Sequence, residues 1–516
     1  MTAWLDAQLG RVTMYRLVLL LLGVFAVAAL VFSILGVVQP GADWVSLLIG
    51  LAVLLVVSYG SNRLLALAFR MKPHSESALI TAGLLFFILR PQSEFAGWVE
   101  LAIAALIAMA SKYLVAFRGR HIFNPAAFSA LVVTLVGAVT SSALGTPFIF
   151  AAWWVGSPWM FPFVIVGGFL VLFRTRRLPM GAVYLGVGLI AYTAQYYLNG
   201  AAFGLTVPDA LYAALFQSAL VFFVGFMLTE PLTLPPRRWQ QLLYAALAAL
   251  IYSISFHIGP FYNSPEFALV VVNLLAFLAG QRRGIRLEYV ARRQLSPTSW
   301  EVDFRPRKPV AFAPGQFMEL TLPHGKTDSR GWRRVFSIAS APGELVRFGI
   351  RLPEKASSFK RALLALEPGT TVSATSVGGD FLLPADPARP LLLVAGGIGI
   401  TPFIGHLEQA AAEPGTRDIA MVYAVSSTDD LAYAEQLSAA GCQVALASPE
   451  KPTNLPSGWT WIGPGRVTGD TLLAAVPDAV KREAFLSGPP AMVADLKRAL
   501  RKAGVRHIHT DVFVGY

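Results

Sequence analysis

Residues 389–407 read RPLLLVAGGIGITPFIGHL, and no residue from 390 to 407 carries a full charge. An uncharged run of this length satisfies the usual length criterion for a transmembrane helix. However, Gly396, Gly397, Gly399 and Pro402 interrupt any helix here, and charged, soluble sequence lies on both sides. We therefore interpret RPLLLVAGG as a buried parallel strand that leads into a phosphate-binding loop, with TPFIGHL beginning the next helix.

The composition divides the chain into two unlike halves. Of its 516 residues, 55% are hydrophobic and 14% are charged, whereas a soluble protein has about 25% charged residues. Residues 1–280 hold 22 of the 72 Asp, Glu, Lys and Arg residues, and residues 281–516 hold the other 50. The sequence therefore predicts a membrane region followed by a soluble region.

The net charge of +12 does not indicate nucleic-acid binding, because the cations of the first half sit in short clusters between apolar runs. Cys442 is the single cysteine, which excludes an intramolecular disulfide and any cysteine-ligated cluster or zinc site. We predict no metal site and no nucleic-acid partner.

The first half contains ten apolar runs that we predict to span a lipid membrane, with short ones allowed where helices are broken and buried. The N-terminal residues before the first run show no small-residue cleavage pattern, so we expect a retained span and not a signal peptide. The runs are 16–38, 44–61, 77–90, 97–117, 124–140, 159–173, 180–198, 210–229, 240–257 and 264–280.

Basic residues between these runs fall on one side of the predicted membrane, and the other side carries only Arg90. By the positive-inside rule the N-terminus is cytoplasmic, and an even number of spans returns the chain to the cytoplasm at QRRGIR, residues 281–286. We therefore expect a multi-pass protein of the bacterial cytoplasmic (inner) membrane with both termini in the cytoplasm.

Two proline-containing stretches, HIFNPAAFSALVV at 121–133 and MLTEPLTLPPRRW at 227–239, lie at the cytoplasmic ends of predicted spans. Asn-Pro and Glu-Pro end or kink a helix, and freed backbone groups are tolerated at membrane depth only where they line an enclosed cavity. The alternative is an ordinary helix start with proline in its first turn.

These stretches, together with the ten-span count, resemble the membrane subunits NqrB and RnfD of sodium-pumping quinone reductases and Rnf electron-transport complexes, over residues 1–280. The resemblance implies a flavin-carrying bundle that moves electrons within or across the membrane. It implies flavin-binding residues at Asn124, Pro125, Thr229 and Glu230.

One departure from that family concerns the attachment of the flavin. The family carries FMN on a threonine in a D-x-x-S-G-A-T-like stretch, whereas VTSSALGTPF at 139–148 has no Asp and a different order. Thr146 is the best remaining candidate. We expect a second flavin, FMN or riboflavin, that is bound non-covalently.

The second half changes pattern twice. From 284 to 385, short alternating runs separated by Pro and Gly predict an antiparallel β-barrel domain. From 386 to 516, apolar strands alternate with helical stretches, which predicts an α/β doubly wound parallel sheet. The expected fold class is thus multidomain, with a helical bundle, a barrel and a nucleotide-binding fold in that order.

Barrel followed by nucleotide fold resembles the ferredoxin–NADP reductase superfamily, and RRVFSIAS at 333–340 matches its R-x-[YF]-S flavin signature. The resemblance implies that Arg334 neutralises the FAD pyrophosphate, that Phe336 lies against the ring system and that Ser337 places a hydroxyl near flavin N5. A fixed cation, a flat apolar face and a small donor suit these tasks.

Two further stretches match the same superfamily. LPEKASSFKRAL at 352–363 implies that Ser357 or Ser358, at a helix start, holds phosphate oxygens. SVGGDF at 376–381, with Gly378 and Phe381, supplies the tight turn that follows.

VAGGIGITPF at 394–403 resembles the nicotinamide-phosphate loop of the superfamily, and FLSGPP at 485–490 resembles its C-G-P-P turn with Ser487 in place of the cysteine. We expect Ser337, Ser487 and Tyr516 to act in catalysis, with Tyr516 stacking on the flavin. The remaining residues expected to bind the coenzyme are Gly396, Gly397, Gly399, Thr401, Pro402, Gly488 and Pro489.

The stretch YAVSSTDDLAY at 423–433 lies where relatives select NADH or NADPH. Ser426 and Ser427 have hydroxyls suited to a 2′-phosphate, but no arginine follows them, and a phosphate pocket normally contains one. The sequence therefore favours NADH slightly and leaves NADPH open.

Two other readings compete with this one. A ferric-reductase or NADPH-oxidase type needs haem between paired histidines, and the first half has only His74, His121 and His257, each near a predicted span end and so expected to be solvated or capping. A transporter with a nucleotide-sensing domain accounts for the broken helices but gives no purpose to the flavin signatures.

The sequence therefore predicts a membrane-bound NAD(P)H dehydrogenase. Hydride from cytoplasmic NAD(P)H reaches FAD, and electrons pass to the bundle flavin and on to a quinone or an extracytoplasmic redox protein. The acidic residues of the first half, including Glu266, fall near predicted span ends, so the sequence gives no case for ion pumping.

Overall fold

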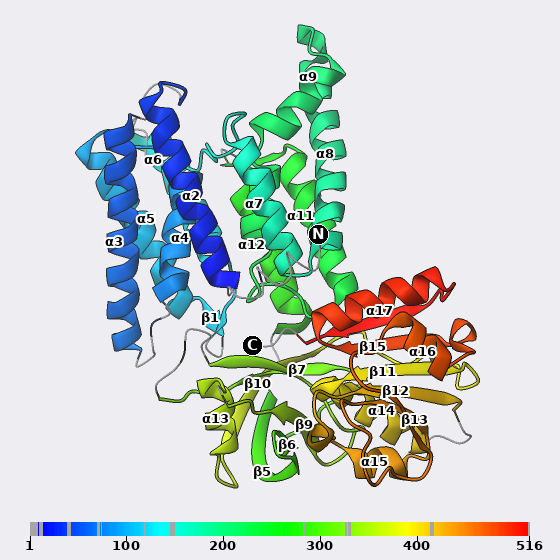
Figure 1. Ribbon diagram of the computed structural model, residues 1–516. Coiled ribbons are helices and arrows are strands. Elements are labelled where there is room, and N and C mark those ends of the chain that lie inside the picture. Colours follow the sequence, from blue (N-terminus) through cyan, green and yellow to red (C-terminus); the bar gives the residue numbers. More distant parts are fainter. Residues whose placement is uncertain are drawn as a thin grey trace. The chain divides into compact units, whose positions relative to one another are not determined.

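The computed structural model describes residues 14–38, 43–69, 75–117, 120–144, 150–259, 261–281, 285–325, 332–354, 356–412 and 417–513, and the single residues 9, 73 and 328. The chain divides into two compact units, one of residues 7–282 and one of residues 283–516. We call them the helical unit and the sheet unit (Figure 1).

The helical unit consists of apolar helices joined by short connections. Two-residue strands form two small hairpins, β1 (Ala116–Phe117) with β2 (Arg120–His121) and β3 (His257–Ile258) with β4 (Phe261–Tyr262). The α-helices are α2 (Met14–Ile34), α3 (Trp44–Ala68), α4 (Ser75–Ile88), α5 (Phe95–Leu114), α6 (Pro125–Leu144), α7 (Phe161–Arg174), α8 (Leu178–Gly200), α9 (Val207–Tyr212), α10 (Leu220–Phe222), α11 (Arg238–Ser253) and α12 (Pro265–Ala276).

Three π-helical segments and one 3₁₀ turn extend or connect these helices: Ala213–Gln217, Phe223–Met227, Phe277–Gln281 and Ala201–Phe203. Each of the ten predicted ranges contains helix. By length and composition, however, four helices among the described residues are able to cross a membrane, or five if the bent pair 207–217 and 220–227 counts as one. Membrane-spanning helices are thus supported, and the number ten stays a prediction.

The two proline-containing stretches differ in structure. Pro125 begins α6, and Asn124 caps it, since its Oδ1 accepts from the amides of Ala126 and Ala127 at 3.0 and 3.2 Å. This is the ordinary helix start that the sequence left as the alternative. Residues 228–237, in contrast, are non-helical and connect the π-helical segment 223–227 to α11.

The sheet unit begins with an antiparallel sheet of order β8-β7-β10-β5-β6-β9. Ile338, just after β8, pairs with Phe348 of β9, so the two edge strands meet at one bridge. The strands are antiparallel as expected, and the barrel and its role in binding FAD stay predictions. The strands are β5 (Ile285–Ser296), β6 (Ser299–Pro306), β7 (Phe317–Thr321), β8 (Arg333–Ser337), β9 (Val346–Arg351) and β10 (Thr371–Gly378), with α13 (Ser358–Leu364) between β9 and β10.

A parallel sheet of order β14-β13-β12-β11-β15-β16 completes the sheet unit, as the sequence predicted for a doubly wound fold. Its strands are β11 (Leu391–Gly396), β12 (Ile419–Ala424), β13 (Gln443–Ala447), β14 (Trp459–Gly463), β15 (Glu483–Gly488) and β16 (Ile508–Val512). Its helices are α14 (Thr401–Ala412), α15 (Ala434–Ala439), α16 (Gly469–Ala475) and α17 (Pro490–Lys502).

Successive residues of β11 enter two different apolar cores. Leu391 and Leu393 join the core under α14 and α15, whereas Leu392 and Val394 join the core under α16 and α17. Figure 1 shows these two helix pairs on opposite faces of the sheet. This double burial explains why β11 is apolar throughout and resembles a membrane span in sequence.

Candidate functional site

The chain reverses its direction of winding between β11 and β15, because β12, β13 and β14 lie on one side of β11 and β15 and β16 on the other. In open parallel sheets, ligands bind at the carboxyl ends of the strands beside such a switch point. The predicted loop 396–402 follows β11 there, and the predicted turn 487–489 lies at the end of β15. The fold therefore brings the two predicted coenzyme stretches together.

The glycines of the first loop have different tasks. A Cβ on Gly399 would lie 2.6 Å from the carbonyl oxygen of Ser487, and one on Gly396 would lie 2.7 Å from Met492. These two glycines let the β11 loop pack against the β15 turn. Gly397 has φ +55° and open space around its Cβ position, so it is the glycine that leaves room for a ligand.

The turn after β15 contributes the other side of this contact. Gly488 has φ +148°, a value that requires glycine, and a Cβ there would lie 3.0 Å from Gly396. Ser487 is fully buried, and its Oγ makes no hydrogen bond with any described residue. An orphaned hydroxyl at a switch point fits a bound coenzyme, which would supply the missing partner.

Helix α14 begins directly after the glycine loop. Thr401 is buried and its Oγ1 donates to the carbonyl oxygen of Ile398 at 3.0 Å, which fixes the loop to the first helical turn. Pro402 is buried in that turn, where its missing N–H costs nothing. The two residues thus shape the helix start, and their coenzyme contacts stay predictions.

In the antiparallel sheet, Arg334 of β8 is 6% exposed and pairs with Asp328, with Nη2 and Oδ1 3.2 Å apart. The other carboxylate oxygen of Asp328 accepts from the amide of Ser358 at 3.0 Å. Asp328 therefore joins the predicted pyrophosphate cation to the predicted phosphate-binding serine. Sequence reasoning missed Asp328, because its loop matches no motif.

The other predicted flavin residues lie close to this pair. Phe336 follows Arg334 on the same face of β8, and its ring packs against Phe348 and Phe359 at centroid distances of 6.2 and 5.9 Å. Ser357 caps α13 by accepting from the amide of Lys360 at 3.3 Å. Its hydroxyl is thus engaged in helix capping.

The tight turn after β10 lies within the predicted stretch 376–381, at Gly379. Gly378 is the last residue of β10, and the neighbouring Gly379 has φ +104° and makes the turn. Phe381 is 5% exposed, and its carbonyl oxygen bonds to Nε2 of His406 at 3.0 Å. Phe381 therefore links the antiparallel sheet to α14.

A hydrogen bond between the two sheets connects the predicted catalytic residue Ser337 to Asp511 of β16. Ser337 donates from Oγ to Oδ2 of Asp511 at 3.2 Å, and Asp511 of β16 is the register partner of Ser487 of β15. Asp511 was not among the predicted site residues, since the position of β16 beside β15 is a property of the fold. A charged residue in a C-terminal strand is too weak a signal by itself.

An arginine from another strand lies beside the residues that follow β12, and the sequence did not predict it there. Arg351 of β9 donates from Nη2 to Ser426 at 3.3 Å and pairs with Asp430 at 3.0 Å. Thr298 donates to the other carboxylate oxygen of Asp430 at 2.5 Å. The observation that no arginine follows Ser427 is correct, but a cation reaches Ser426 from another strand.

Residues 393–498 match the family described as "Oxidoreductase NAD-binding domain". The match includes the glycine loop after β11 and the turn after β15. This part of the chain is therefore similar to an oxidoreductase NAD-binding domain. The NAD-binding domain thus has its predicted loops at the switch point of the parallel sheet.

The second half of the chain is also similar in sequence to curated proteins of electron-transfer systems. The ferredoxin reductase component of 3-ketosteroid-9-alpha-monooxygenase from Mycolicibacterium smegmatis is 30% identical over 208 residues, 40% of this chain and 56% of that protein. The electron transfer component of toluate 1,2-dioxygenase from Pseudomonas putida is 30% identical over 206 residues, 38% of this chain and 56% of that protein. The names of these relatives describe a ferredoxin reductase component and an electron transfer component, in agreement with the predicted class of enzyme.

The chain spans little more than half the length of these relatives. Among solved structures, the Amycolatopsis cytochrome P450 reductase GcoB has a TM-score of 0.40 and 24% identity, with 45% of this chain and 70% of that chain covered. A Neisseria gonorrhoeae ferredoxin NADP⁺ reductase with bound FAD and NADP has a TM-score of 0.38 and 18% identity, with 44% and 98% covered. Likeness of this size carries no functional argument.

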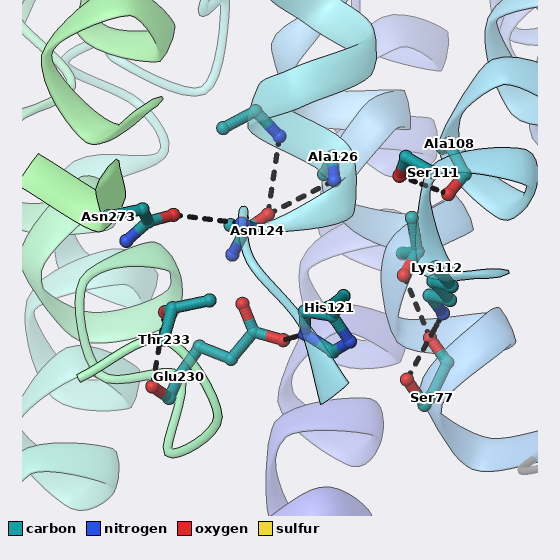
Figure 2. Close-up of polar contacts among 12 residues, drawn as sticks. Ser77, Ala108, Ser111, Lys112, His121, Asn124, Ala126, Glu230, Thr233 and Asn273 are labelled. Carbon is teal, nitrogen blue, oxygen red and sulfur yellow. Dashed lines mark hydrogen bonds and ion pairs between the residues drawn. The ribbon is translucent and has the colours of Figure 1, made fainter. Parts of the chain in front are cut away.

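The helical unit has a polar cluster of its own, at the start of α6 and in the non-helical segment 228–237 (Figure 2). Nε2 of His121 lies 2.7 Å from Oε1 of Glu230, and His121 is 7% exposed. This corrects the expectation of a solvated or capping histidine. The second carboxylate oxygen of Glu230 is buried without a hydrogen-bond partner among the described residues.

Asn124 connects this cluster to the core of the helical unit. Its amide donates to Oδ1 of Asn273 on α12 at 2.8 Å, and Asn273 donates to the hydroxyl of Tyr244 on α11 at 2.6 Å.

Thr229 is fully buried, and its carbonyl oxygen accepts from Arg177. All four predicted flavin residues thus lie in or beside the two proline-containing stretches, and their flavin contacts stay predictions.

Three expected residues, Tyr516, Thr146 and His74, lie outside the described residues. Stacking of Tyr516 on a flavin and attachment of FMN to Thr146 therefore stay predictions. The described strand that leads toward Tyr516 is anchored to the β15 turn, because the amide of Phe513 donates to the carbonyl oxygen of Gly488 at 2.9 Å.

Proposed function

We propose that the chain is a membrane-bound NAD(P)H dehydrogenase that oxidises NAD(P)H in the sheet unit and passes electrons to an acceptor in or beyond the helical unit. The observation that carries the proposal is the meeting of three predicted coenzyme elements at one switch point. The open Gly397, the orphaned hydroxyl of Ser487 and the Ser337–Asp511 hydrogen bond all lie at the carboxyl ends of β11, β15 and β16 or in contact with them.

The loop from Gly396 to Thr401 would hold the coenzyme pyrophosphate. Gly397 leaves space for it, and the N-terminus of α14, whose helix dipole favours an anion, begins at the end of the loop. The turn at Ser487, Gly488 and Pro489 would hold the nicotinamide, with the Ser487 hydroxyl as its hydrogen-bond partner. The packing of Gly399 on Ser487 keeps these two subsites at a fixed separation.

The network of Arg334, Asp328 and Ser358 would hold the FAD pyrophosphate, and Ser337 would face the reacting edge of the flavin. When bound, FAD supplies the chemistry that accepts a hydride and releases electrons singly. Asp511 orients the Ser337 hydroxyl, because an ionised carboxylate accepts a stronger hydrogen bond than a neutral oxygen does.

We propose NADH as the preferred coenzyme. Asp430 lies at the end of β12, where an acidic residue in dinucleotide-binding folds accepts from the ribose 2′-hydroxyl. Its charge repels a 2′-phosphate, and it also neutralises Arg351, the cation that otherwise suits that phosphate. Ser426 and Ser427 alone are a weak phosphate site.

For the helical unit, we propose a non-covalently bound second flavin, FMN or riboflavin, beside Asn124, Pro125, Thr229 and Glu230. The unpaired oxygen of Glu230 and the buried imidazole of His121 are polar groups with capacity to recognise the polar edge of a flavin ring. The final acceptor would be a quinone or an extracytoplasmic redox protein, with the chain in the bacterial cytoplasmic membrane and both termini in the cytoplasm.

The test is a cofactor and acceptor analysis of the full chain in proteoliposomes. We expect FAD and a second flavin in equal amounts, bleaching of flavin absorbance by NADH, and reduction of a membrane quinone or of an acceptor trapped on the far side. One flavin per chain after careful purification would eliminate the two-flavin relay. Haem absorbance would favour a ferric-reductase type, and solute uptake without acceptor reduction would favour a transporter.

A further inference from the structure

Thr298, in the turn between β5 and β6, is a residue of the antiparallel sheet that contacts the loop after β12. Its hydroxyl donates to Oδ1 of Asp430 at 2.5 Å, across 132 positions of sequence. Among the described residues, Asp430 is the only hydrogen-bond partner of this hydroxyl. The proposed function assigns Asp430 to the coenzyme and gives Thr298 no task.

The backbone around Thr298 fixes the position of this hydroxyl. The amide of Leu352, just after β9, donates to the carbonyl oxygen of Thr298 at 2.7 Å. The amide of Ser299 donates to Oγ of Ser296 at 3.1 Å, which closes the turn. A β-branched side chain has few rotamers, so ordering the hydroxyl costs little entropy. The donor is therefore held in place before any ligand arrives.

The strand beside this turn, β9, packs on the nucleotide-binding part of the sheet unit. Arg347 pairs with Glu408 of α14, with Nη2 2.6 Å from Oε2. A Cβ on Gly349 would lie 2.3 Å from Cγ2 of Thr401, the first residue of α14. Residues 347, 349 and 351 of a strand share one face. This face of β9 therefore runs along the coenzyme-binding elements and leads to Arg351.

Arg351 binds the other oxygen of Asp430. It is the register partner of Ser299, next to Thr298, and its Nη2 lies 3.0 Å from Oδ2 of Asp430. The hydroxyl of Ser426, 3.5 Å from the same oxygen, is a weaker third contact. Two donors on different oxygens fix the rotation of a carboxylate, whereas one donor leaves it free to turn. The Asp430 side chain is 13% exposed, so a ligand can still reach the carboxylate.

Without the Thr298 hydroxyl, Arg351 would be the one strong donor to Asp430. A guanidinium binds a carboxylate best through two parallel hydrogen bonds, and a freed carboxylate can turn to take both. It would then have fewer lone pairs for a ribose 2′-hydroxyl, and its charge would repel a 2′-phosphate less. The selecting power of Asp430 therefore depends on Thr298.

We propose that Thr298 is a positioning residue for coenzyme choice. Its hydroxyl holds the Asp430 carboxylate in the orientation that accepts the ribose 2′-hydroxyl of NADH and repels a 2′-phosphate. This rests on the proposed function, which places the adenosine ribose at the end of β12. Thr298 acts through Asp430 and does not touch the coenzyme. A turn of the antiparallel sheet thus takes part in a selection made on the parallel sheet.

The test is calorimetric binding of ADP-ribose and 2′-phospho-ADP-ribose to the full chain in detergent. Thr298→Val should shift the ratio of the two Kd values toward 2′-phospho-ADP-ribose by about threefold to tenfold, mainly by weakening ADP-ribose. Thr298→Ser keeps a hydroxyl and should restore the wild-type ratio. Thr371→Val is the matched control, because it removes an exposed threonine hydroxyl of the same sheet that accepts from Arg307 at 3.0 Å.

A double variant separates positioning from a general structural role. In an Asp430→Asn background, Thr298→Val should leave the ratio of Kd values unchanged, because the residue acts through the Asp430 charge. A further shift of the ratio in the double variant overturns the proposal. Equal weakening of both ligands by Thr298→Val, accompanied by a lower unfolding temperature, also overturns it, since that result describes a structural residue.

Binding needs no electron transfer, so the proposal and the proposed function fail differently. If NADH does not bleach the flavin, the dehydrogenase function fails, and the two ADP-ribose ligands still decide the role of Thr298. If the flavin bleaches and Thr298→Val keeps the wild-type ratio, the positioning role is overturned and the dehydrogenase function stands. An unchanged ratio in Asp430→Asn, or a wild type that binds neither ligand, overturns the positioning role together with the coenzyme assignment of Asp430.

Discussion

Ser337 of the antiparallel sheet donates a hydrogen bond to Asp511 of the parallel sheet, with Oγ and Oδ2 3.2 Å apart. The two residues are 174 positions apart in sequence. Asp511 is also the register partner of Ser487 in the neighbouring strand β15. The bond therefore ties the proposed flavin site to the proposed nicotinamide site.

Replacement of Asp511 by Ala tests this relationship. A hydrogen bond to a charged group contributes about 1.5–3 kcal/mol, so its loss should lower kcat for NADH-dependent reduction by roughly 10- to 100-fold. The KM for NADH should change little, because Asp511 orients Ser337 and does not hold the pyrophosphate. Asp495→Ala removes a carboxylate from an exposed ion pair on α17 and is the control. Equal kcat values in both variants would contradict the assignment.

Two glycines of the loop after β11 can be tested as a pair. Gly399 is expected to be needed for packing, and Gly397 is expected to be needed for coenzyme binding. Gly399→Ala places a Cβ 2.6 Å from the Ser487 carbonyl oxygen and should lower the free energy of unfolding by about 1–3 kcal/mol. Gly397→Ala meets open space and should cost only the strain of its positive φ, about 1–2 kcal/mol at most.

For coenzyme binding we expect the opposite ranking of the two variants, with the larger effect in Gly397→Ala. Gly397→Ala should raise the KM for NADH strongly, because its Cβ occupies the space left for the pyrophosphate. Thermal unfolding and steady-state kinetics on both variants check this pair. An unchanged KM in Gly397→Ala would show that the pyrophosphate lies elsewhere.

Coenzyme choice should depend on the pair formed by Arg351 and Asp430. Asp430→Asn removes the charge that repels a 2′-phosphate and leaves Arg351 available to bind it. We expect the ratio of kcat/KM for NADPH to that for NADH to rise by about tenfold or more, as for a charge contact of about 1.4 kcal/mol. Asp429→Asn, at the exposed neighbouring position, is the control. A fall in the ratio would reject Asp430 as the selecting residue.

His406 should make the sheet unit sensitive to acid. Burial holds the pKa of His406 at about 4, below its ordinary value of 6.5, although Nε2 bonds to the Phe381 carbonyl oxygen. The unfolded chain therefore binds a proton as the pH falls through 6.5, while the folded chain binds it only near pH 4. Stability is present above pH 6.5 and is lost between 6.5 and 4, by roughly 3 kcal/mol in total.

Thermal unfolding of the full chain against pH measures this effect. His406→Gln cannot take up a proton, so its unfolding temperature should vary less between pH 6.5 and 4 than that of the wild type. His507→Gln, on an exposed histidine before β16, is the matched control and should retain the wild-type slope. Parallel pH profiles for wild type and His406→Gln would contradict the assignment.

The local sequence by itself determined the type of several elements in the sheet unit. The run 390–396 is apolar at every position because β11 is buried on both faces, and the glycines that follow end the strand where the phosphate loop was predicted. The same local rules placed a helix boundary at Pro125, but they left open whether the proline breaks a helix or begins one. Its position after the capping Asn124 settled the second alternative.

Only the tertiary structure decided which residues meet. Arg351 reaches Ser426 from a different sheet, Ser337 of β8 donates to Asp511 of β16, and Trp153 donates to the buried Glu266 of α12. Local propensity fixes the pattern of one segment, whereas contacts between segments depend on how the strands are ordered and how the helices pack. For this reason the sequence predicted the loops of the site and missed the charged residues that connect them.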